Sequence, residues 1–309
     1  MLTIHINVSG ELGDGTTLSR WFFDRVGTDT DWASVDTGDS HTVAIKTDGS
    51  LWAWGRNQFG VLGDGTTTHS TVPIQIGTDT NWLMAAAGFG HTIAIKTDGS
   101  LWAWGSNSQG QLGNGRDRGV DSGSLVPIQI GIDTDWAYVM ASHWHSFAIK
   151  TDGSLWAWGD NHSGQLGDGT GERRLYPVRI EDDTTWSSVA SERIHTLAIR
   201  TDGSLWAWGN NWNGMLGDGT TTSRSSPVRV GMYYDWVSVA AGGGYSVAVR
   251  EDGSLWVWGS RTLLTFGGLA VRDLTVPTQI YPDEHWVSVV AGNSRAFGIT
   301  KDGRIQRLG

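Results

Sequence analysis

The chain has 309 residues, a formal net charge of −10 and no cysteine. This charge disfavours nucleic acid and anionic membranes as partners, and the lack of cysteine excludes disulfides and thiolate metal sites but leaves the cellular compartment open. No apolar run approaches the ~20 residues that span a bilayer, so we expect a soluble chain. Forty-four glycines and only 17% charged residues are typical of many tight turns between buried strands, which predicts an all-β protein.

A repeat of about 50 residues runs through the whole sequence. The segment TDGSLWAWG occurs at 47–55, 97–105, 151–159 and 201–209, EDGSLWVWG occurs at 251–259, and a diverged copy, KDGRIQRLG, occurs at 301–309. Six tryptophans keep the same phase, mostly after DTDW-like turns: Trp32, Trp82, Trp136, Trp186, Trp236 and Trp286. We therefore expect one domain over 1–309, with six repeats at approximately 1–46, 47–96, 97–150, 151–200, 201–250 and 251–309.

Each repeat resolves into four short predicted strands. In the second copy they are Trp82–Ala87, His91–Lys96, Ser100–Trp104 and Val126–Ile130. The Asp-Gly pair at 98–99 is a hairpin signal, because both residues tolerate positive φ. The run Leu101-Trp102-Ala103-Trp104 is apolar on both alternating sets, so this strand must be covered on both faces.

The fourth strand differs, because Val72, Ile74 and Ile76 alternate with Pro73 and Gln75. A proline recurs at 73, 127, 177, 227 and 277, and proline removes a ladder donor, so this strand belongs at a sheet edge. Strands covered on both faces and proline-marked edges together predict a β-propeller of six four-stranded blades.

A solenoid is the alternative architecture, and the two ends of the chain disfavour it. The last copy stops after three strands, while the segment Trp21–Val26 offers a candidate fourth strand. Pairing of these N- and C-terminal strands would close the sixth blade and leave no orphan edge. Met1–His5 and Ile305–Gly309 occupy the same repeat phase, so one of them must be displaced, or the chain was cut from a longer propeller.

The combination of TDGSLWAWG, xNxxGQLGDGT, PxxI, DW and GxxHT resembles the bacterial version of the regulator of chromosome condensation repeat, across essentially the whole chain. Six copies of such a multi-part motif are a specific signal. The resemblance implies a propeller, most often with seven blades, that serves in different members as a guanine-nucleotide exchange factor, an ultraviolet-B photoreceptor or a β-lactamase inhibitor. It leaves the function of this chain open, because a fold does not fix a function.

The repeated residue types have structural interpretations. Sixteen of the nineteen tryptophans occupy three repeat positions, which we interpret as core anchors, and only Trp21, Trp144 and Trp212 fall outside the pattern. The histidines at one phase, His41, His91, His145 and His195, are expected to hydrogen-bond loop backbone. The Asp-rich turns lack the order and the glutamate of a calcium loop. We therefore expect no catalytic residue, no metal and no cofactor.

Candidate binding residues come from loops whose copies disagree with one another. In a four-stranded meander the first-to-second and third-to-fourth loops share one side of the blades, which we call the loop face, and the near-identical TDG and DTDW turns share the other, the turn face. The loop face carries aromatic and arginine residues among Ser, Asn and Gly, as protein-binding hot spots do. The candidates are Arg56, Phe59, Phe89, His143, Trp144, His162, Arg193, Ile194 and Trp212.

We expect His143, Trp144, Arg193, Ile194 and Trp212 to form one continuous patch. By resemblance, the inhibitor and the photoreceptor also use residues just before the recurrent histidine. The sequence therefore predicts a monomeric, non-enzymatic binding module or inhibitor with a protein partner of unknown identity, and no nucleic acid or membrane partner. Exchange-factor-like regulation, an enzyme with a site at a channel mouth, and drift of unconstrained loop tips are the alternatives.

Overall fold

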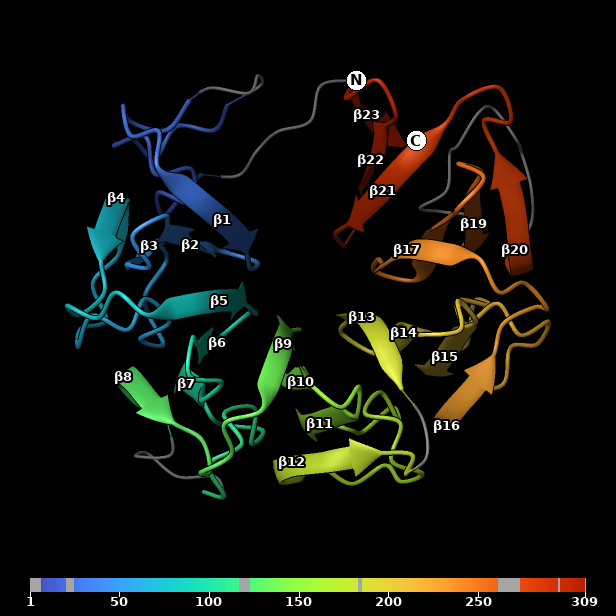
Figure 1. Ribbon diagram of the computed structural model, residues 1–309, viewed down its shortest axis with the longest axis horizontal. Coiled ribbons are helices and arrows are strands. Elements are labelled where there is room, and N and C mark those ends of the chain that lie inside the picture. The colour runs from blue at the N-terminus through green and yellow to red at the C-terminus, as the bar shows by residue number, and fades with distance from the viewer. Residues whose placement is uncertain are drawn as a thin grey trace. The chain divides into compact units, whose positions relative to one another are not determined.

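A computed structural model of the chain describes residues 7–20, 25–116, 123–182, 185–260, 273–293 and 295–308. In these ranges all regular structure is β, in strands β1 to β23 (Figure 1). The described residues accordingly include no helix long and apolar enough to cross a membrane.

The strands form six antiparallel sheets, one for each repeat. The first consists of β1 (Trp32–Thr37), β2 (His41–Lys46), β3 (Leu51–Gly55) and β4 (Ser70–Gln75), and the second of β5 (Trp82–Ala87), β6 (His91–Lys96), β7 (Leu101–Gly105) and β8 (Ser124–Gln129). The third consists of β9 (Trp136–Ala141), β10 (His145–Lys150), β11 (Leu155–Gly159) and β12 (Arg174–Ile180).

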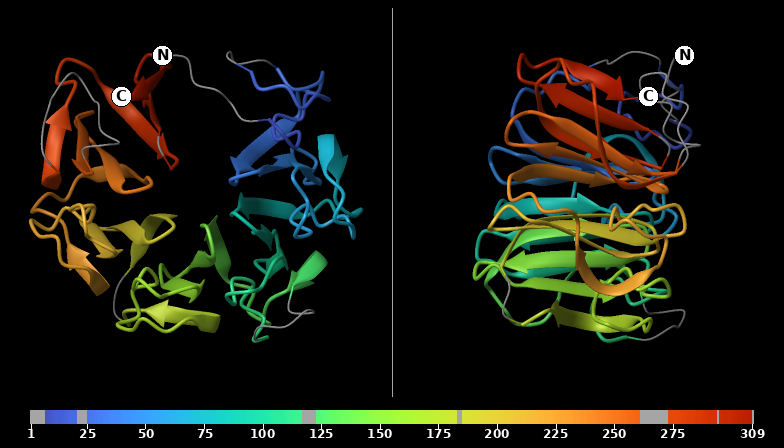
Figure 2. Two further views of the ribbon diagram at one scale, coloured as in Figure 1. Left: turned by 180° about the vertical axis from the view of Figure 1, so that it is seen from behind. Right: turned by 90° about the vertical axis from the view of Figure 1, so that its right-hand side faces the viewer.

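The fourth sheet consists of β13 (Trp186–Glu192), β14 (His195–Arg200), β15 (Leu205–Gly209) and β16 (Arg224–Arg229), and the fifth of β17 (Trp236–Ala241), β18 (Tyr245–Arg250), β19 (Leu255–Gly259) and β20 (Leu274–Ile280). The sixth has three strands among the described residues: β21 (Trp286–Ala291), β22 (Ala296–Thr300) and β23 (Ile305–Leu308). Every sheet is a meander in which neighbours in sequence are neighbours in space (Figures 1 and 2).

The predicted strands of the second repeat are confirmed with small shifts. The first two have the predicted bounds, the third begins one residue later, and the fourth is Ser124–Gln129. Gly99 adopts a φ of 79° in the Asp-Gly turn, and its amide donates to the Lys96 carbonyl at 2.9 Å. Asp98 accepts the Ser100 amide at 2.9 Å, so both turn residues serve the hairpin.

The fourth strand lies at a sheet edge as predicted, but its alternation is broken. Ala53 pairs with Ile74, whereas Gly55 pairs with Ser70. Three residues of β4, 71–73, therefore lie opposite the single residue 54 of β3, which makes a bulge with two extra residues. Pro73 lies in this bulge, where its missing N–H leaves no ladder bond unmade. Because of the bulge Val72 is exposed, whereas the simple alternation placed it on the same side as Ile74.

The chain divides into two compact units. The first comprises residues 1–151, 158–160 and 173–177, and the second comprises residues 152–157, 161–172 and 178–309. Within each unit, one sheet packs on the next through buried side chains. In the first unit Val43, Ile45 and Leu51 of one repeat pack with Trp82 and Trp104 of the next. That the chain is one domain stays a prediction.

The second tryptophan of each WAWG segment ties neighbouring repeats together. The Trp104 indole N–H donates to the Val61 carbonyl at 2.7 Å, and Trp104 is fully buried. A Cβ on Gly63 would lie 2.8 Å from the Trp104 indole nitrogen, so this loop position requires glycine. The same bond recurs from Trp54 to Glu11, Trp158 to Gln111, Trp208 to Gln165 and Trp258 to Met215.

The first tryptophan of each WAWG segment departs from the prediction of burial on both faces, because it is only half-buried. The Lys96 ammonium lies 4.1 Å from the Trp102 ring centroid and 4.7 Å from that of Trp82, and Asp79 binds it at 2.6 Å. A charged group therefore covers this ring where an apolar one was expected, by cation–π attraction.

These sheets are the blades of a six-blade β-propeller fold, as the sequence predicts. Closure by pairing of the two terminal segments involves residues 1–6, 21–24 and 309, which lie outside the described residues. Two third-to-fourth loops depart from the repeat in sequence, one by a four-residue insertion near Arg116–Ser124 and one by the aberrant stretch Leu263–Leu269. Most of the first and all of the second lie outside the described residues as well.

Candidate protein-binding face

Three loops of the first unit bring four ring side chains together, which we call the aromatic cluster: Phe59, Phe89, His143 and Trp144. Phe59 lies between β3 and β4, Phe89 between β5 and β6, and the other two between β9 and β10. The Phe89 ring centroid lies 4.3 Å from that of His143, 4.8 Å from Trp144 and 6.2 Å from Phe59. The two kinds of loop therefore meet, as the prediction of a loop face requires.

The geometry within the aromatic cluster is that of attractive ring pairs. Phe89 and His143 are stacked at 26°, whereas Trp144 stands edge-on to His143 at 88° and to Phe59 at 70°. Such pairs contribute about 0.5–1.5 kcal/mol each beyond the area they bury. A Cβ on Gly90 would lie 3.0 Å from the Trp144 ring, so the glycine leaves room for the indole.

All four side chains of the aromatic cluster are half-buried. Trp144 is not a solvent-exposed loop tip, because its ring packs against Phe59 and Phe89, which come from loops of two other sheets. A cluster fixed in this way loses little rotamer entropy when a partner binds it.

The loop that carries Phe59 is held by a buried asparagine. The Asn57 side-chain oxygen Oδ1 accepts the Leu62 amide at 3.0 Å, and its side-chain NH2 group donates to the backbone carbonyls of Thr66 and Thr68, each at 3.1 Å. Gly60 adopts a φ of 73°, and its amide donates to the Asn57 carbonyl. The variable side chain at 59 therefore projects from a rigid loop.

Asp39 adds a charge beside the aromatic cluster. Its carboxylate lies 3.8 Å from Nε2 of His143, and both side chains are partly exposed. Asp39 occupies the same repeat position as Phe89 and His143, just before the recurrent histidine. It was not among the residues predicted from the sequence, because a lone aspartate in a loop is an ordinary turn residue.

Arg56 is the remaining candidate of the first unit. It is half-buried, its guanidinium donates to the Gln58 side chain, and its amide donates to the Ser40 carbonyl at 2.8 Å. None of the described contacts joins it to the aromatic cluster.

The candidates of the second unit have loops of a different shape. Arg193 has a φ of 45° in the short loop between β13 and β14, an uncommon conformation for a residue with a side chain. Its side chain is 45% exposed and its Nε lies 3.6 Å from the Glu192 carboxylate. Ile194 is half-buried, and its carbonyl accepts the Asn210 amide at 2.8 Å.

Trp212 and His162 project from the third-to-fourth loops of the second unit. Trp212 is 76% exposed, and its amide donates to the Asn210 side chain at 3.1 Å. His162 is exposed as well. The continuity of these residues with His143 and Trp144 stays a prediction.

The recurrent histidines serve the interior. Nε2 of His41 lies 2.9 Å from the Thr92 hydroxyl, which donates to the Val61 carbonyl at 2.7 Å. His91 and His195 make the same contact with Ser146 and Ser246. The hydroxyl hydrogen is already used, so Nε2 must carry the proton. The expected bond to loop backbone is therefore made through a hydroxyl of the next repeat.

Burial keeps these histidines neutral. It lowers the pKa of His41 and of His91 to about 3, and that of His195 to about 4. Their Nδ1 atoms have no hydrogen-bond partner among the described residues. A neutral ring with one bonded nitrogen fits a packing role.

The acidic turns likewise have a structural function. Lys46 lies between the rings of Trp32 and Trp52, and its ammonium binds Asp29 at 2.6 Å and Asp31 at 3.2 Å. These carboxylates are thus engaged by a cation of the chain itself. Within the described ranges, no three His, Asp or Glu side chains are grouped so that they could hold a metal ion.

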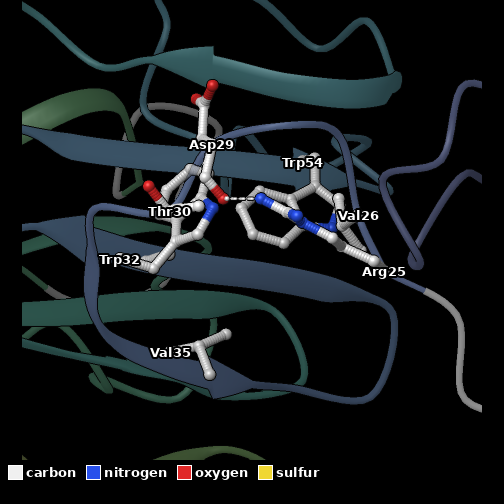
Figure 3. Close-up of a pocket in the computed structure, with 8 residues that line it drawn as sticks. Arg25, Val26, Asp29, Thr30, Trp32, Val35 and Trp54 are labelled. Carbon is white, nitrogen blue, oxygen red and sulfur yellow. Dashed lines mark hydrogen bonds between the residues drawn. The ribbon is translucent and has the colours of Figure 1, made fainter.

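A cavity of about 520 Å³ beside β1 was not anticipated from the sequence (Figure 3). It is lined by Arg25, Val26, Asp29, Thr30, Trp32, Val35, Ala44 and Trp54. Val35 is 63% exposed here, whereas Val139, at the same repeat position, is 1% exposed. The lining is therefore the kind of surface on which sheets pack elsewhere in this chain.

A family model, that of the RCC1-like domain, matches residues 1–298. The chain belongs to the RCC1-like domain family. A search of curated proteins found no match. Among solved structures, human WBSCR16 is 20% identical with a TM-score of 0.87, and the alignment covers 99% of this chain and 87% of that chain.

Two structures of the yeast member Prp20 also match this RCC1-like chain. Prp20p from Saccharomyces cerevisiae, described with its binding to Gsp1p and histones, is 26% identical with a TM-score of 0.73, covering 84% of this chain and 66% of that chain. Yeast RCC1 (Prp20) bound to Kap60 is 22% identical with a TM-score of 0.69, and the alignment covers 87% of this chain and 80% of that chain. The resemblance noted in the repeats is thus confirmed at the level of family and fold.

Proposed function

We propose that this RCC1-like chain is a non-catalytic protein-binding module or inhibitor whose loop face recognises its partner, with the aromatic cluster as the anchor. The observation that carries the proposal is the packing of Phe59, Phe89, His143 and Trp144, from loops of three sheets, into one half-buried group. Partly exposed aromatic side chains of this kind dominate the binding energy of many protein interfaces.

Comparison between repeats supports this assignment. The position of Phe59 is Gln109, Ser163 and Asn213 in later repeats, and the position of Trp144 is Ser40 and Gly90 in earlier ones. Blades of the same fold form with these smaller residues, so the scaffold does not require the rings. A feature that the fold does not require needs a different explanation, and binding supplies one.

The solved relatives give a second, coarser support. Prp20p is described as binding Gsp1p and histones, and a separate structure contains Prp20 bound to Kap60. All three are proteins. Members of this family therefore act through protein contacts, and we extend that behaviour to this chain without extending the identity of the partner.

The test is affinity capture from the organism of origin, followed by measurement of the dissociation constant for each captured protein. The double variant Phe59→Gln and Trp144→Ser introduces residues that other repeats hold at the same positions, so the sheets should still form. We expect binding to weaken at least tenfold. The matched control is Ile132→Thr, which removes a 90% exposed apolar side chain from the turn face of the same unit.

Thermal unfolding of each variant separates lost binding from lost structure. A partner whose affinity survives the double variant, and falls with Ile132→Thr, would place the working surface on the turn face and refute the proposal. Equal loss in both variants would point to a general change in the first unit.

A further inference from the structure

One turn of the second unit breaks the uniformity of the turn face. Between β16 and β17 the sequence Gly-Met-Tyr-Tyr-Asp, 231–235, stands where the second repeat has Gly-Thr-Asp-Thr-Asn, 77–81. The backbone of the two turns is alike: Gly231 has a φ of 64° and Gly77 of 66°, and a Cβ on Gly203 would meet the Tyr234 carbonyl at 1.9 Å, as one on Gly49 would meet the Thr80 carbonyl at 2.2 Å. Only the side chains of the turn differ.

Tyr233 has a scaffold role that explains its presence. It replaces Asp79, the partner of Lys96, and its ring lies 3.8 Å from the Arg250 guanidinium carbon. The displaced charge is restored by Asp235, which binds Arg250 at 2.7 Å. The cation of this repeat is therefore still covered by a ring and a carboxylate.

No described contact joins Met232 or Tyr234 to the Arg250 guanidinium. They are 86% and 58% exposed, beside Tyr233 at 43%, so three large side chains face solvent in one turn. Arg229 fixes the Tyr234 ring: its guanidinium carbon lies 4.1 Å from the ring centroid, and its Nη1 donates to the phenol oxygen at 2.8 Å. Met, Tyr and Arg are the residue types enriched in interface cores.

The charges around this turn indicate what it would bind. Arg229 is occupied by Tyr234, and Arg250 binds Asp235 at 2.7 Å and lies 3.6 Å from Asp252. Asp202 and Glu251 are exposed beside them, so the carboxylates at this turn outnumber these two arginines. The side-chain and backbone hydrogen bonds from Ser204 lower the pKa of Asp202, with smaller effects of the Arg200 and Arg229 charges, so this acid stays charged. The surface is apolar at its centre and negative at its rim, and a partner should show the complement.

We propose that Met232, Tyr233 and Tyr234 form a second protein-binding surface, on the turn face. Its partner is a protein segment with a large apolar side chain flanked by lysine or arginine. This surface is independent of the aromatic cluster, since it lies at the opposite ends of the strands and in the second unit.

The test uses the full chain and a library of labelled peptides in which leucine, phenylalanine or methionine lies between lysines or arginines at varied spacing. Two matched libraries replace the basic residues by glutamate or the apolar residues by serine. Fluorescence anisotropy reports binding to the wild type and to Met232→Thr/Tyr234→Thr, which takes its residues from Thr78 and Thr80. Ile132→Thr, which removes a 90% exposed apolar side chain from the corresponding turn of the first unit, is the control.

We expect peptides of the first library alone to bind, with at least a tenfold loss for the double variant, an unchanged affinity for Ile132→Thr, and weakening in salt. Equal binding by the double variant, equal binding of the glutamate library, or no binding by any peptide would overturn the proposal. Neutral lipid vesicles form a last arm, since exposed tyrosine and methionine could instead enter a lipid interface. Vesicle binding that the double variant abolishes, without peptide binding, would also overturn it.

Discussion

Two tryptophans of the third sheet show how the same residue serves two purposes in this molecule. Trp158, in β11, has a counterpart in each of the first five sheets, is fully buried, and donates to the Gln111 carbonyl at 2.8 Å. Trp144, in the loop before β10, has no counterpart in the other repeats and is half-buried against Phe89. In a repeat protein the demands of the scaffold are repeated, so a large side chain that occurs once needs an explanation outside the scaffold.

Trp158→Ala tests this contrast with the largest expected effect. Removing this ring leaves a cavity between sheets and takes one of two donors from the Gln111 carbonyl, which keeps the Ser146 hydroxyl at 2.9 Å. We expect a loss of about 3–5 kcal/mol in the free energy of unfolding, mainly from the cavity. Urea unfolding followed by circular dichroism measures it. Trp158 is a stricter test than Trp156, because Trp156 is only half-buried. A loss below that of Trp144→Ser would contradict the division between repeated and unique tryptophans.

A second test removes the N-terminal segment, residues 1–26, which contacts the first sheet through Glu11. The Glu11 carbonyl accepts from the Trp54 indole at 3.0 Å and from the Thr42 hydroxyl at 2.9 Å, as the Val61 carbonyl does one repeat later. Deleting residues 1–26 would strip both bonds and expose Trp54, at a cost of about 3 kcal/mol, and should promote aggregation. A monomeric truncation with an unchanged melting temperature would show that this segment contributes nothing.

The buried histidines predict how stability depends on pH. Their folded pKa values, about 3 for His41 and His91 and about 4 for His195, lie below the unfolded value of about 6.5. Below pH 6.5 the unfolded chain takes up protons that the folded chain cannot, so stability falls from pH 6.5 towards 4 and these groups have no effect above 6.5. Each contributes roughly 1 kcal/mol per pH unit.

Urea midpoints at pH 7, 6 and 5 check this slope, with His195→Gln as the comparison. The variant should be less stable at pH 7 but should lose stability less steeply, because one of the three buried groups no longer titrates. A slope that the variant leaves unchanged would mean that other groups, for instance the carboxylates of the turns, govern acid unfolding.

The sequence predicts the fold well because the repeat supplies six readings of one pattern. The bounds of β5 and β6 follow from Trp82 and His91, and the edge position of β8 follows from its proline. What the sequence does not predict are the places where one chemical type of side chain takes the position of another. Lys96 covers Trp102 where an apolar contact was expected, and Tyr233 replaces Asp79 against a cation, because both substitutions depend on side-chain geometry that letters do not carry.

The candidate site is predicted in its members and not in its packing. Variability before the recurrent histidine selects Phe89, His143 and Trp144, and meander geometry places Phe59 at the same end of the strands. That these rings stack on one another depends on how adjacent repeats are spaced, which no single loop sequence encodes. For the same reason Asp39 was not selected, although it lies at the same repeat position.

Trp144→Ser measures how much the tryptophan without a counterpart in other repeats contributes to stability. The substitution removes three aromatic contacts but leaves no buried polar group unpaired. We therefore expect the free energy of unfolding to fall by about 1–2 kcal/mol, well below the loss for Trp158→Ala. Differential scanning calorimetry of both variants gives the ranking. A cost above about 3 kcal/mol would make Trp144 part of the scaffold after all.

Trp212→Gln should have the smallest effect on stability of these tryptophan substitutions. Gln58 occupies the same position in the first repeat, and Trp212 is 76% exposed, so the ring contributes little buried area. The one described bond of this residue is made by its backbone amide to Asn210, which the substitution preserves. We therefore expect the unfolding free energy to change by no more than about 0.5 kcal/mol. Partner affinity is the discriminating measurement: a tenfold loss at unchanged stability would extend the loop-face surface to the second unit, whereas unchanged affinity would confine it to the aromatic cluster.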